Sequence, residues 1–344
     1  MLTYILKRIA LMLPTLLGAL TITFIVVQFV PGGPIEQIMA EARDGGAGDT
    51  GGYRASKDTD ARQIAELKKL YGFDKPVGER YIEMLVNFAR FDLSRSFMHN
   101  KDVWQLIKEK LPVSISLGLW TFVLSYLISV PLGIAKARRE GTRFDAITTL
   151  LVLVGFAIPG FVLGILLIVL FAGGTFWDVF PLRGLTSDNW AELSCGARVT
   201  DYLWHLALPL TCLVIHSFAV LTLLTKNTFV EEIRKQYVLV ARAKGFSQQQ
   251  VLYRHIFRNA LLPLVTHFPA AFVGAFFSGS VLIETLFSLD GMGLLGYEAV
   301  VRRDFPVVLG TLYFFTLIAV VTKLMSDILY RVIDPRVQFG SVSK

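Results

Sequence analysis

The sequence predicts an all-α integral membrane protein with six transmembrane helices, and two observations lead to this fold class. The first is composition, because 53% of the 344 residues are hydrophobic and only 18% are charged, whereas soluble domains average about 25% charged residues. The second is charge distribution. Lys, Arg, Asp and Glu are absent from six long stretches, namely residues 9–30, 111–135, 146–177, 202–225, 259–283 and 305–322. A helix needs about 20 residues to cross the hydrocarbon core, so each stretch is a candidate span.

The first, third and sixth spans differ from a simple membrane-crossing helix. The first follows Lys7 and Arg8, and its apolar core is longer than the roughly 7–15 residues of a signal peptide, so we interpret it as a retained anchor. The third is longer than one span needs, which predicts a helix plus an interfacial piece around residues 173–174. The sixth is expected to continue through Lys323 and Asp327, which lie one helical turn apart. A structural ion pair, a lysine that snorkels to the interface and a proton relay remain open for these two residues.

The orientation follows from the basic residues. With the N-terminus in the cytoplasm, the inside segments 1–8, 136–145, 226–258 and 329–344 carry 16 Lys and Arg and five acidic residues, whereas the outside segments carry 17 basic and 21 acidic residues. Cytoplasmic loops of membrane proteins are enriched in Lys and Arg. Both termini are therefore expected in the cytoplasm, and the net charge of +7 is explained by contact with anionic lipid and a partner surface rather than nucleic acid.

The spans divide the chain into four parts. Residues 1–30 form an anchor helix, residues 31–110 an extracytoplasmic helical insertion, residues 111–330 a five-helix core, and residues 331–344 a cytoplasmic tail. The insertion contains a glycine-rich stretch and then apolar residues at helical spacing. A docking surface for an extracytoplasmic partner and a passive cap over the mouth both remain open.

The inside loop 226–258 within the core is the most informative segment. Gly245 is expected to end one helix, because glycine tolerates left-handed geometry, and Ser247 to cap the next. A basic helix–Gly–helix unit of this kind is suited to inserting into a cleft of another protein. The alternative is an ordinary helical hairpin lying on the membrane.

Two parts of this loop resemble a known family. The stretches Tyr-Val-Leu-Val-Ala-Arg-Ala-Lys-Gly at 237–245 and Arg-Asn-Ala-Leu-Leu-Pro at 258–263 resemble the coupling loop of bacterial ABC-importer permeases of the oligopeptide, dipeptide and nickel family. Supporting motifs are Pro-Gly-Gly-Pro at 31–34, Leu-Pro at 111–112, Ile-Pro-Gly-Phe at 158–161, Glu-Thr-Leu-Phe-Ser at 284–288, Gly-Met-Gly at 291–293, Arg-Asp-Phe-Pro at 303–306 and Asp-Pro-Arg-Val at 334–337. Segments 71–76 and 180–185 resemble a peptide-permease branch of that family.

The resemblance implies a type I ABC-importer permease fold and a set of partners. An importer of this family has two permease subunits, here expected to be unlike, and two ATP-binding subunits, and it receives its cargo from a periplasmic peptide-binding protein. The general permease signature begins Glu-Ala-Ala, whereas this chain has Leu-Val-Ala at 239–241. A docking contact through a carboxylate at position 239 is therefore excluded.

The matched positions define three groups of candidate residues. The resemblance implies ATPase coupling through the 236–247 helix, with residues Tyr237, Ala241, Arg242, Ala243, Lys244, Gly245 and Phe246. We interpret the segment between the fifth and sixth spans as an outer gate loop, with residues Glu284, Phe287, Gly291, Gly293 and Gly296. Close helix packing or a bend in the third span is expected at Pro159, Gly160 and Gly164, where the two glycines form a GxxxG pattern.

The chain carries no phosphate loop, since no G-x-x-x-x-G-K-[ST] occurs. Residues 291–296 have the glycine spacing of a nucleotide site, but Tyr297 and Glu298 follow in place of Lys and Ser or Thr. No catalytic residue, metal site or cofactor is therefore expected in this chain, and ATP and Mg²⁺ are expected on the partner subunits. The chain is a non-catalytic subunit by this interpretation, in the bacterial inner membrane.

The cargo is the least determined property. The five histidines and two cysteines lie at no ligand spacing, which argues against direct nickel coordination, and uncharged spans suit a conduit for variable peptides. We expect oligopeptide import. The alternatives are nickel or another small solute within the same family, and, in a different class, an ATP-independent secondary transporter or channel.

Overall fold

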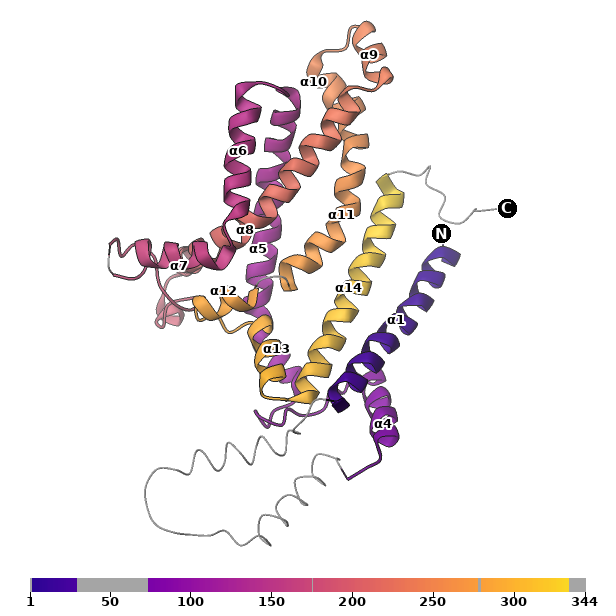
Figure 1. The fold of residues 1–344 in the computed structure, drawn as a ribbon, viewed down its shortest axis with the longest axis vertical. Helices are drawn as coiled ribbons and strands as arrows, with labels where there is room; N and C mark the ends of the chain where they lie inside the picture. Colours follow the sequence, from indigo (N-terminus) through magenta and orange to yellow (C-terminus); the bar gives the residue numbers. More distant parts are fainter. Residues whose placement is uncertain (1, 30–73, 175, 278–279, 334–344) are drawn as a thin grey trace. The chain divides into compact units, whose positions relative to one another are not determined.

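The computed structural model describes residues 2–29, 74–174, 176–277 and 280–333, and every named element in these ranges is helical (Figure 1). A 3₁₀ turn at Trp190–Glu192 and a π-helix at Leu252–Ile256 accompany the α-helices. The α-helices are α1 (Leu2–Phe29), α4 (Val77–Ala89), α5 (Val103–Arg138), α6 (Arg143–Ala157), α7 (Gly160–Phe171), α8 (Cys195–Ile233), α9 (Gln236–Ala243), α10 (Gln248–Val251), α11 (Phe257–Phe277), α12 (Ser280–Leu286), α13 (Met292–Val301) and α14 (Phe305–Ile333).

Several of these helices are suited to cross a membrane. Within the described residues, four are long and apolar enough, in α1, α5, α8 and α14, and the bent pair α6–α7 would make a fifth. The prediction of a helical multi-pass membrane protein is therefore confirmed. The count of six stays a prediction, because the expected fifth span covers both α11 and α12, and residues 278–279 between them lie outside the described residues.

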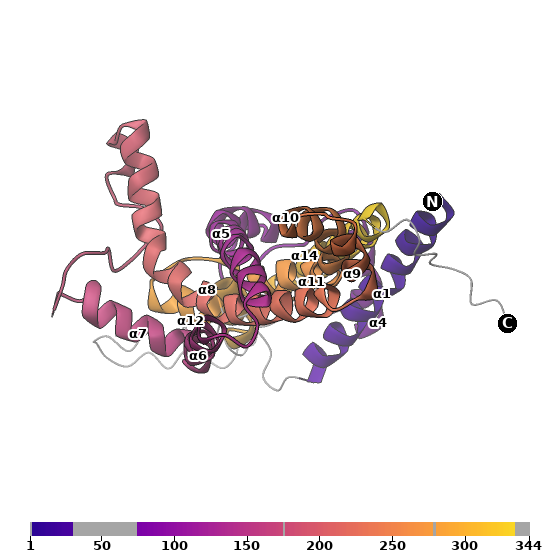
Figure 2. The ribbon, with the colours of Figure 1, turned by 90° about the horizontal axis from the view of Figure 1, so that it is seen from above.

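The third predicted span bends at Pro159, which is one of the two outcomes that the sequence predicts there. Helices α6 and α7 meet at a bend of 91°, and in Figure 2 α6 is seen end-on where α7 is seen along its length. The break falls at Ile158 and Pro159, and α7 then ends at Phe171, just before residues 173–174. Proline has no N–H to donate and disfavours helical geometry in the residue before it, so Ile158 is extended, with φ −84° and ψ 118°.

The chain divides into two compact units. The first comprises residues 1–9, 112–294 and 318–344, and α8 packs in it against α6, α7 and α11. Helices α9 and α10 lie at the same end of this unit as the α5–α6 connection (Figure 1). The backbones of α5 and α8 approach closely, because a Cβ built on Gly133 would lie 2.9 Å from the carbonyl oxygen of Thr222.

The second unit comprises residues 10–111 and 295–317. The buried carboxylate of Asp304 accepts hydrogen bonds from the hydroxyl of Ser96 and from the backbone N–H groups of Phe97, at 3.0 Å, and Met98, at 3.3 Å. This carboxylate fixes the loop before α5 against the start of α14. Most of the predicted insertion, residues 31–73, lies outside the described residues, and α4 is the described helix within it.

Asp327 forms an ion pair with another helix. A structural pair between Lys323 and Asp327 was one of the open possibilities, but the Asp327 carboxylate instead lies 3.2 Å from the guanidinium of Arg8 in α1. Because Asp327 pairs with Arg8 of another helix, the side chain of Lys323 remains exposed.

Candidate coupling surface and outer loop

Helix α9 ends in a motif that requires glycine. Gly245 has φ +84°, its N–H donates to the carbonyl of Arg242, and the N–H of Phe246 donates to the carbonyl of Ala241. These two bonds are the pair that defines a Schellman motif, in which the residue after the cap is left-handed. Gly245 therefore lies one residue beyond the cap, which is Lys244.

The two faces of α9 differ sharply. Val238 and Ala241 are buried in an apolar cluster with residues of α5, α8, the π-helix and α11, whose buried members include Ala137, Phe229, Leu252, Ile256 and Ala260. The opposite face carries Leu239 and Val240, which are 61% and 55% exposed. Of the predicted coupling residues, Arg242, Ala243, Lys244, Gly245 and Phe246 are exposed, Ala241 is buried and Tyr237 is half-buried. An exposed face that combines apolar and basic side chains is suited to contact another protein.

Tyr237 contacts its own chain. Its hydroxyl donates to Oε2 of the buried Glu232 at 2.6 Å and accepts from the side-chain amide of Asn259 at 3.2 Å. Lys235 pairs with the other oxygen of the same carboxylate. Burial and the hydrogen bond to Glu232 raise the pKa of Tyr237 to about 12. Tyr237 therefore holds α9 against the ends of α8 and α11.

The connection from α9 to α11 is short and tightly capped. Ser247 and Gln250 form a capping box, in which the Ser247 hydroxyl accepts from the N–H of Gln250 and the Gln250 side chain accepts from the N–H of Ser247. The predicted capping role of Ser247 is confirmed. The π-helix at Leu252–Ile256 then leads directly into α11.

The predicted outer loop is organised by Glu284. Its side chain is fully buried, and Oε2 accepts a hydrogen bond of 2.6 Å from the backbone N–H of Leu294 in the first turn of α13. The hydroxyl of Ser114 in α5 accepts from the N–H of Met292 at 2.8 Å. Both side chains satisfy N–H groups that a helix start leaves without a partner. Phe287 is buried in an apolar cluster with Leu289 and residues of α5 and α8.

The loop is shorter than predicted. Gly291 precedes α13, whereas Gly293 and Gly296 lie within that helix. The reason is the cap supplied by Glu284 and Ser114, which lets the helix begin directly after Gly291. Gly291 also permits a close approach, since a Cβ there would lie 2.6 Å from Cδ of Glu284.

Comparison with known proteins shows the family. Residues 129–339 match the family described as binding-protein-dependent transport system inner membrane component. The chain is 51% identical to the peptidoglycan transport system permease protein YejB of Agrobacterium fabrum and 49% identical to the inner membrane ABC transporter permease protein YejB of Escherichia coli O157:H7, with 98% of each chain covered in both cases. It is 31% identical to the oligopeptide transport system permease protein AppB of Bacillus subtilis, over 98% of this chain and all of that one. The chain belongs to this family of ABC-importer permeases.

The predicted resemblance is thereby confirmed, and the protein is a multi-pass inner-membrane permease subunit that works with ATPase and binding-protein partners. A comparison with solved structures matches the permease to the inward-facing MetNI methionine ABC transporter, at 14% identity and a TM-score of 0.49, with 67% of this chain and 97% of that one covered.

The bend of the permease between α6 and α7 is accompanied by close packing. Pro159 is the cap residue of α7. A Cβ on Gly160 would lie 3.3 Å from the carbonyl oxygen of Cys212 in α8, and one on Gly164 would lie 2.7 Å from Cδ2 of Leu286 in α12. Both glycines face Cys212, whose Sγ would lie 3.5 Å from a Cβ on Gly164, and Gly164 also allows a close approach to α12.

A cavity of about 390 Å³ lies between α5, α7, α8, α11 and α12 of the permease. The described residues that line it include no charged side chain, and they combine hydroxyl, imidazole and aromatic groups: Thr121, Phe122, Ser125, Tyr126, His216, Ser217 and His267. The hydroxyls of Thr121, Ser125 and Tyr126 are buried and make no hydrogen bond in the described part of the chain. Many other hydroxyls in these helices bond to the carbonyl four residues earlier, such as that of Thr225. The cavity therefore offers polar groups that its own helices do not use.

Sequence reasoning missed two groups of residues. The sequence gives no sign that Glu232 is buried and accepts a hydrogen bond from Tyr237, and it counts Lys136 and Lys226 only as inside charges. The available signal was local, since Lys136 and Asp145 are basic and acidic residues at the two ends of a short hairpin, directly at the membrane boundary. Their pairing with Lys226 depends on a helix about 80 residues further along the chain.

Proposed function

We propose that this permease imports oligopeptides, including peptides released from the cell wall, that an extracytoplasmic binding protein delivers. The observation that carries the proposal is similarity over 98% of both chains to permeases named for peptidoglycan and oligopeptide transport. The uncharged lining that the described residues give the cavity also supports it, because a conduit for peptides of varied sequence must tolerate side chains of either charge.

The energy for import comes from ATP hydrolysed by separate subunits, which dock on the exposed face of α9. The basic pair Arg242 and Lys244 and the apolar side chains Leu239, Val240 and Phe246 support this assignment, since all five are exposed. A second, unlike permease subunit completes the type I importer, both termini lie in the cytoplasm, and the loop around Glu284 and Gly291 forms part of the outer gate.

The test is transport by the complete complex. The permease is purified with its accompanying subunits and placed in liposomes, with ATP on the side that α9 faces and binding protein on the other. Labelled oligopeptides, muropeptides and Ni²⁺ are offered separately. We expect peptide accumulation that requires both ATP and binding protein. Accumulation of Ni²⁺ without peptide would assign a different cargo, and uphill transport without ATP would contradict the ABC mechanism.

The docking surface is tested in the same preparation. Replacing both Arg242 and Lys244 by Glu reverses two charges on the exposed face, and we expect the ATPase subunits to be lost on purification, because like charges across an interface repel. The control is Gln249→Glu, which adds a negative charge at an exposed position on α10, outside helix α9. Equal retention of the ATPase subunits by both variants would place the docking site elsewhere.

A further inference from the structure

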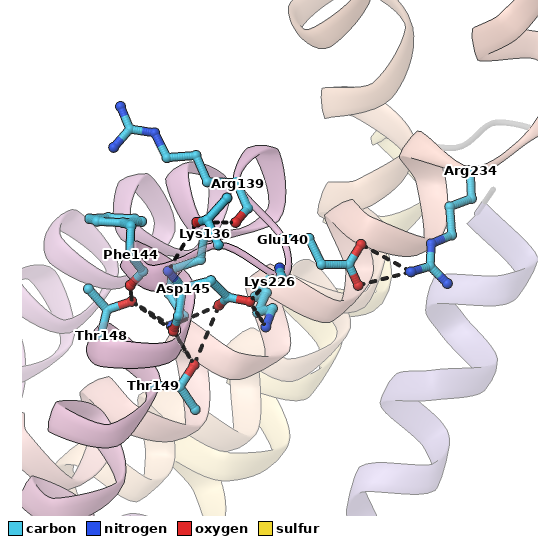
Figure 3. A network of polar contacts seen from close by, with 11 residues as sticks. Lys136, Arg139, Glu140, Phe144, Asp145, Thr148, Thr149, Lys226 and Arg234 are labelled. Carbon is cyan, nitrogen blue, oxygen red and sulfur yellow. Dashed lines mark hydrogen bonds and ion pairs between the residues drawn. The ribbon is translucent and has the colours of Figure 1, made fainter.

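A fully buried lysine lies at the end of α5. The Nζ of Lys136 donates to the carbonyl oxygen of Asp145 at 3.0 Å and to the hydroxyls of Thr148 and Thr149, each at 2.7 Å (Figure 3). An ammonium group has three donors, so all three are used. Nζ also lies 3.2 Å from Oδ1 of Asp145, which makes an ion pair across the α5–α6 connection.

The carboxylate of Asp145 is shared between two helices. Its Oδ2 lies 2.7 Å from Nζ of Lys226, which belongs to α8, while Oδ1 faces Lys136. The exposed fractions of the three side chains are 0% for Lys136, 8% for Asp145 and 18% for Lys226. We call these three residues the buried charge link. They join the end of α5, the start of α6 and the last third of α8.

Burial distinguishes this link from the usual basic residues of an inside loop, which extend into water or toward lipid headgroups. Removing one partner of a buried ion pair leaves an uncompensated charge, which is strongly unfavourable. Two surfaces packed only through apolar side chains can slide past each other at small cost, but elements joined by a buried charge pair must move together or break it.

The buried charge link lies next to the residues that support α9 in the apolar cluster. Ala137, next to Lys136, and Phe229, one turn after Lys226, both belong to the apolar cluster that holds Val238 and Ala241 of α9. The residues that support α9 are therefore chain neighbours of the residues that form the link. A displacement of α9 would therefore act on α5 and α8 next to the buried charge link.

We propose that Lys136, Asp145 and Lys226 are positioning residues that make α9, α8 and the α5–α6 hairpin move as one body, so that ATPase-driven displacement of α9 reaches the membrane helices. This inference rests on the proposed coupling role of α9. The link touches neither cargo nor nucleotide, and it acts by fixing the angle between α8 and the hairpin.

The chain offers a matched control. Arg234, the C-cap residue of α8, donates to both carboxylate oxygens of Glu140, at 2.9 and 3.0 Å, and so joins the end of α8 to the same hairpin. These side chains are 69% and 41% exposed, and exposed ion pairs contribute little because water screens them. Glu140→Gln removes a bridge between the same two elements without leaving a buried charge.

The first experiment follows distance. Spin labels are placed at Gln249→Cys in α10 and Ile147→Cys in α6, both exposed positions, in the complete complex with Cys195→Ser and Cys212→Ala. The distance distribution is measured without nucleotide and with ATP and vanadate. We expect one narrow distribution that nucleotide leaves unchanged in the parent and in Glu140→Gln, and a shifted or broadened one in Lys226→Gln. A parent distance that changes on adding nucleotide, or a Lys226→Gln distribution identical to the parent's, would overturn the proposal.

The second experiment follows coupling. Lys226→Gln leaves Lys136 paired with Asp145, so the complex is expected to assemble, and the quantity measured is cargo imported per ATP hydrolysed. We expect it to fall roughly tenfold, within the usual range of coupling free energies, and to return with Lys226→Arg. A lower yield of complex with an unchanged ratio would show a purely structural role and contradict the proposal. If the wild-type complex imports no peptide, the proposed function fails, while the distance measurement needs no cargo and still decides the inference.

Discussion

The carboxylate of Glu284 lies where a side chain at Gly291 would begin. A Cβ built on Gly291 would be 2.6 Å from Cδ and 2.7 Å from Oε1 of Glu284, while Oε2 accepts the N–H of Leu294. Because Gly291 has no side chain, the buried carboxylate of Glu284 fits beside it. The two residues together therefore cap the start of α13 and allow the tight turn before it.

The close approach of Glu284 to Gly291 predicts that substitution by alanine has different effects on stability at Gly291 and at Gly296. Gly291→Ala forces the carboxylate away from the helix start and should cost about 1–3 kcal/mol, as overpacking does. Gly296→Ala should be neutral or stabilise by up to about 1 kcal/mol, because no atom lies within 4 Å of its Cβ and alanine favours helix. The measurement is the fraction of folded complex that survives heating in detergent. Equal survival of the two variants would show that the Glu284 cap does not depend on Gly291.

At Gly245 the constraint is backbone conformation rather than space. Its φ is +84° and no atom lies within 4 Å of a Cβ, so Gly245→Ala should cost about 1–2 kcal/mol from left-handed geometry alone. Gly245→Asn should cost less, because asparagine adopts this geometry more readily. Cargo-stimulated ATP hydrolysis by the complex should follow the order Gly, Asn, Ala. An alanine variant as active as the parent would contradict the need for a left-handed residue.

Tyr237 predicts a specific pH dependence of stability. Its pKa of about 12 in the folded chain exceeds the value of about 10 for a free tyrosine. A raised pKa gives a contribution that is complete below pH 10 and is lost as the pH rises from 10 toward 12. The stability difference between the parent and Tyr237→Phe should therefore be the same at pH 7 and pH 9 and narrow only above pH 10. A difference that already changes between pH 7 and pH 9 would assign the titration to another group.

The contact between Gly164 and Leu286 can be tested by compensation. Gly164→Ala places a methyl group 2.7 Å from Cδ2 of Leu286, which should destabilise the α7–α12 contact by about 1–3 kcal/mol. Leu286→Ala removes the obstructing atom, so the double variant should be more stable than the sum of the single effects predicts. Strict additivity in thermal survival of the complex would show that these residues are not in contact.

The sequence predicted features that depend on local pattern. Stretches free of charge became long helices, Ser247 capped a helix, and the motif around Gly245 adopted the expected left-handed turn. Each of these depends on residues within one or two helical turns, where composition and spacing are sufficient.

The features that the sequence did not reveal involve partners that are distant in sequence. Asp327 pairs with Arg8, from the other end of the chain, rather than with Lys323 four residues away. Glu284 acquires its role from α13, and Lys136 acquires part of its setting from α8. The bend at Pro159, in contrast, is a confirmed prediction, because its signal is local: proline removes a backbone donor and disfavours helical geometry in the residue before it.

The exposed face of α9 has a consequence for how the cell makes this protein. Leu239 and Val240 are exposed on the chain by itself, and exposed apolar side chains favour aggregation. A permease synthesised in excess of its ATPase would present this face to chaperones and proteases. Synthesis of the permease and the ATPase subunits in equal amounts, for example from one transcript, would prevent unassembled permease from accumulating in the membrane.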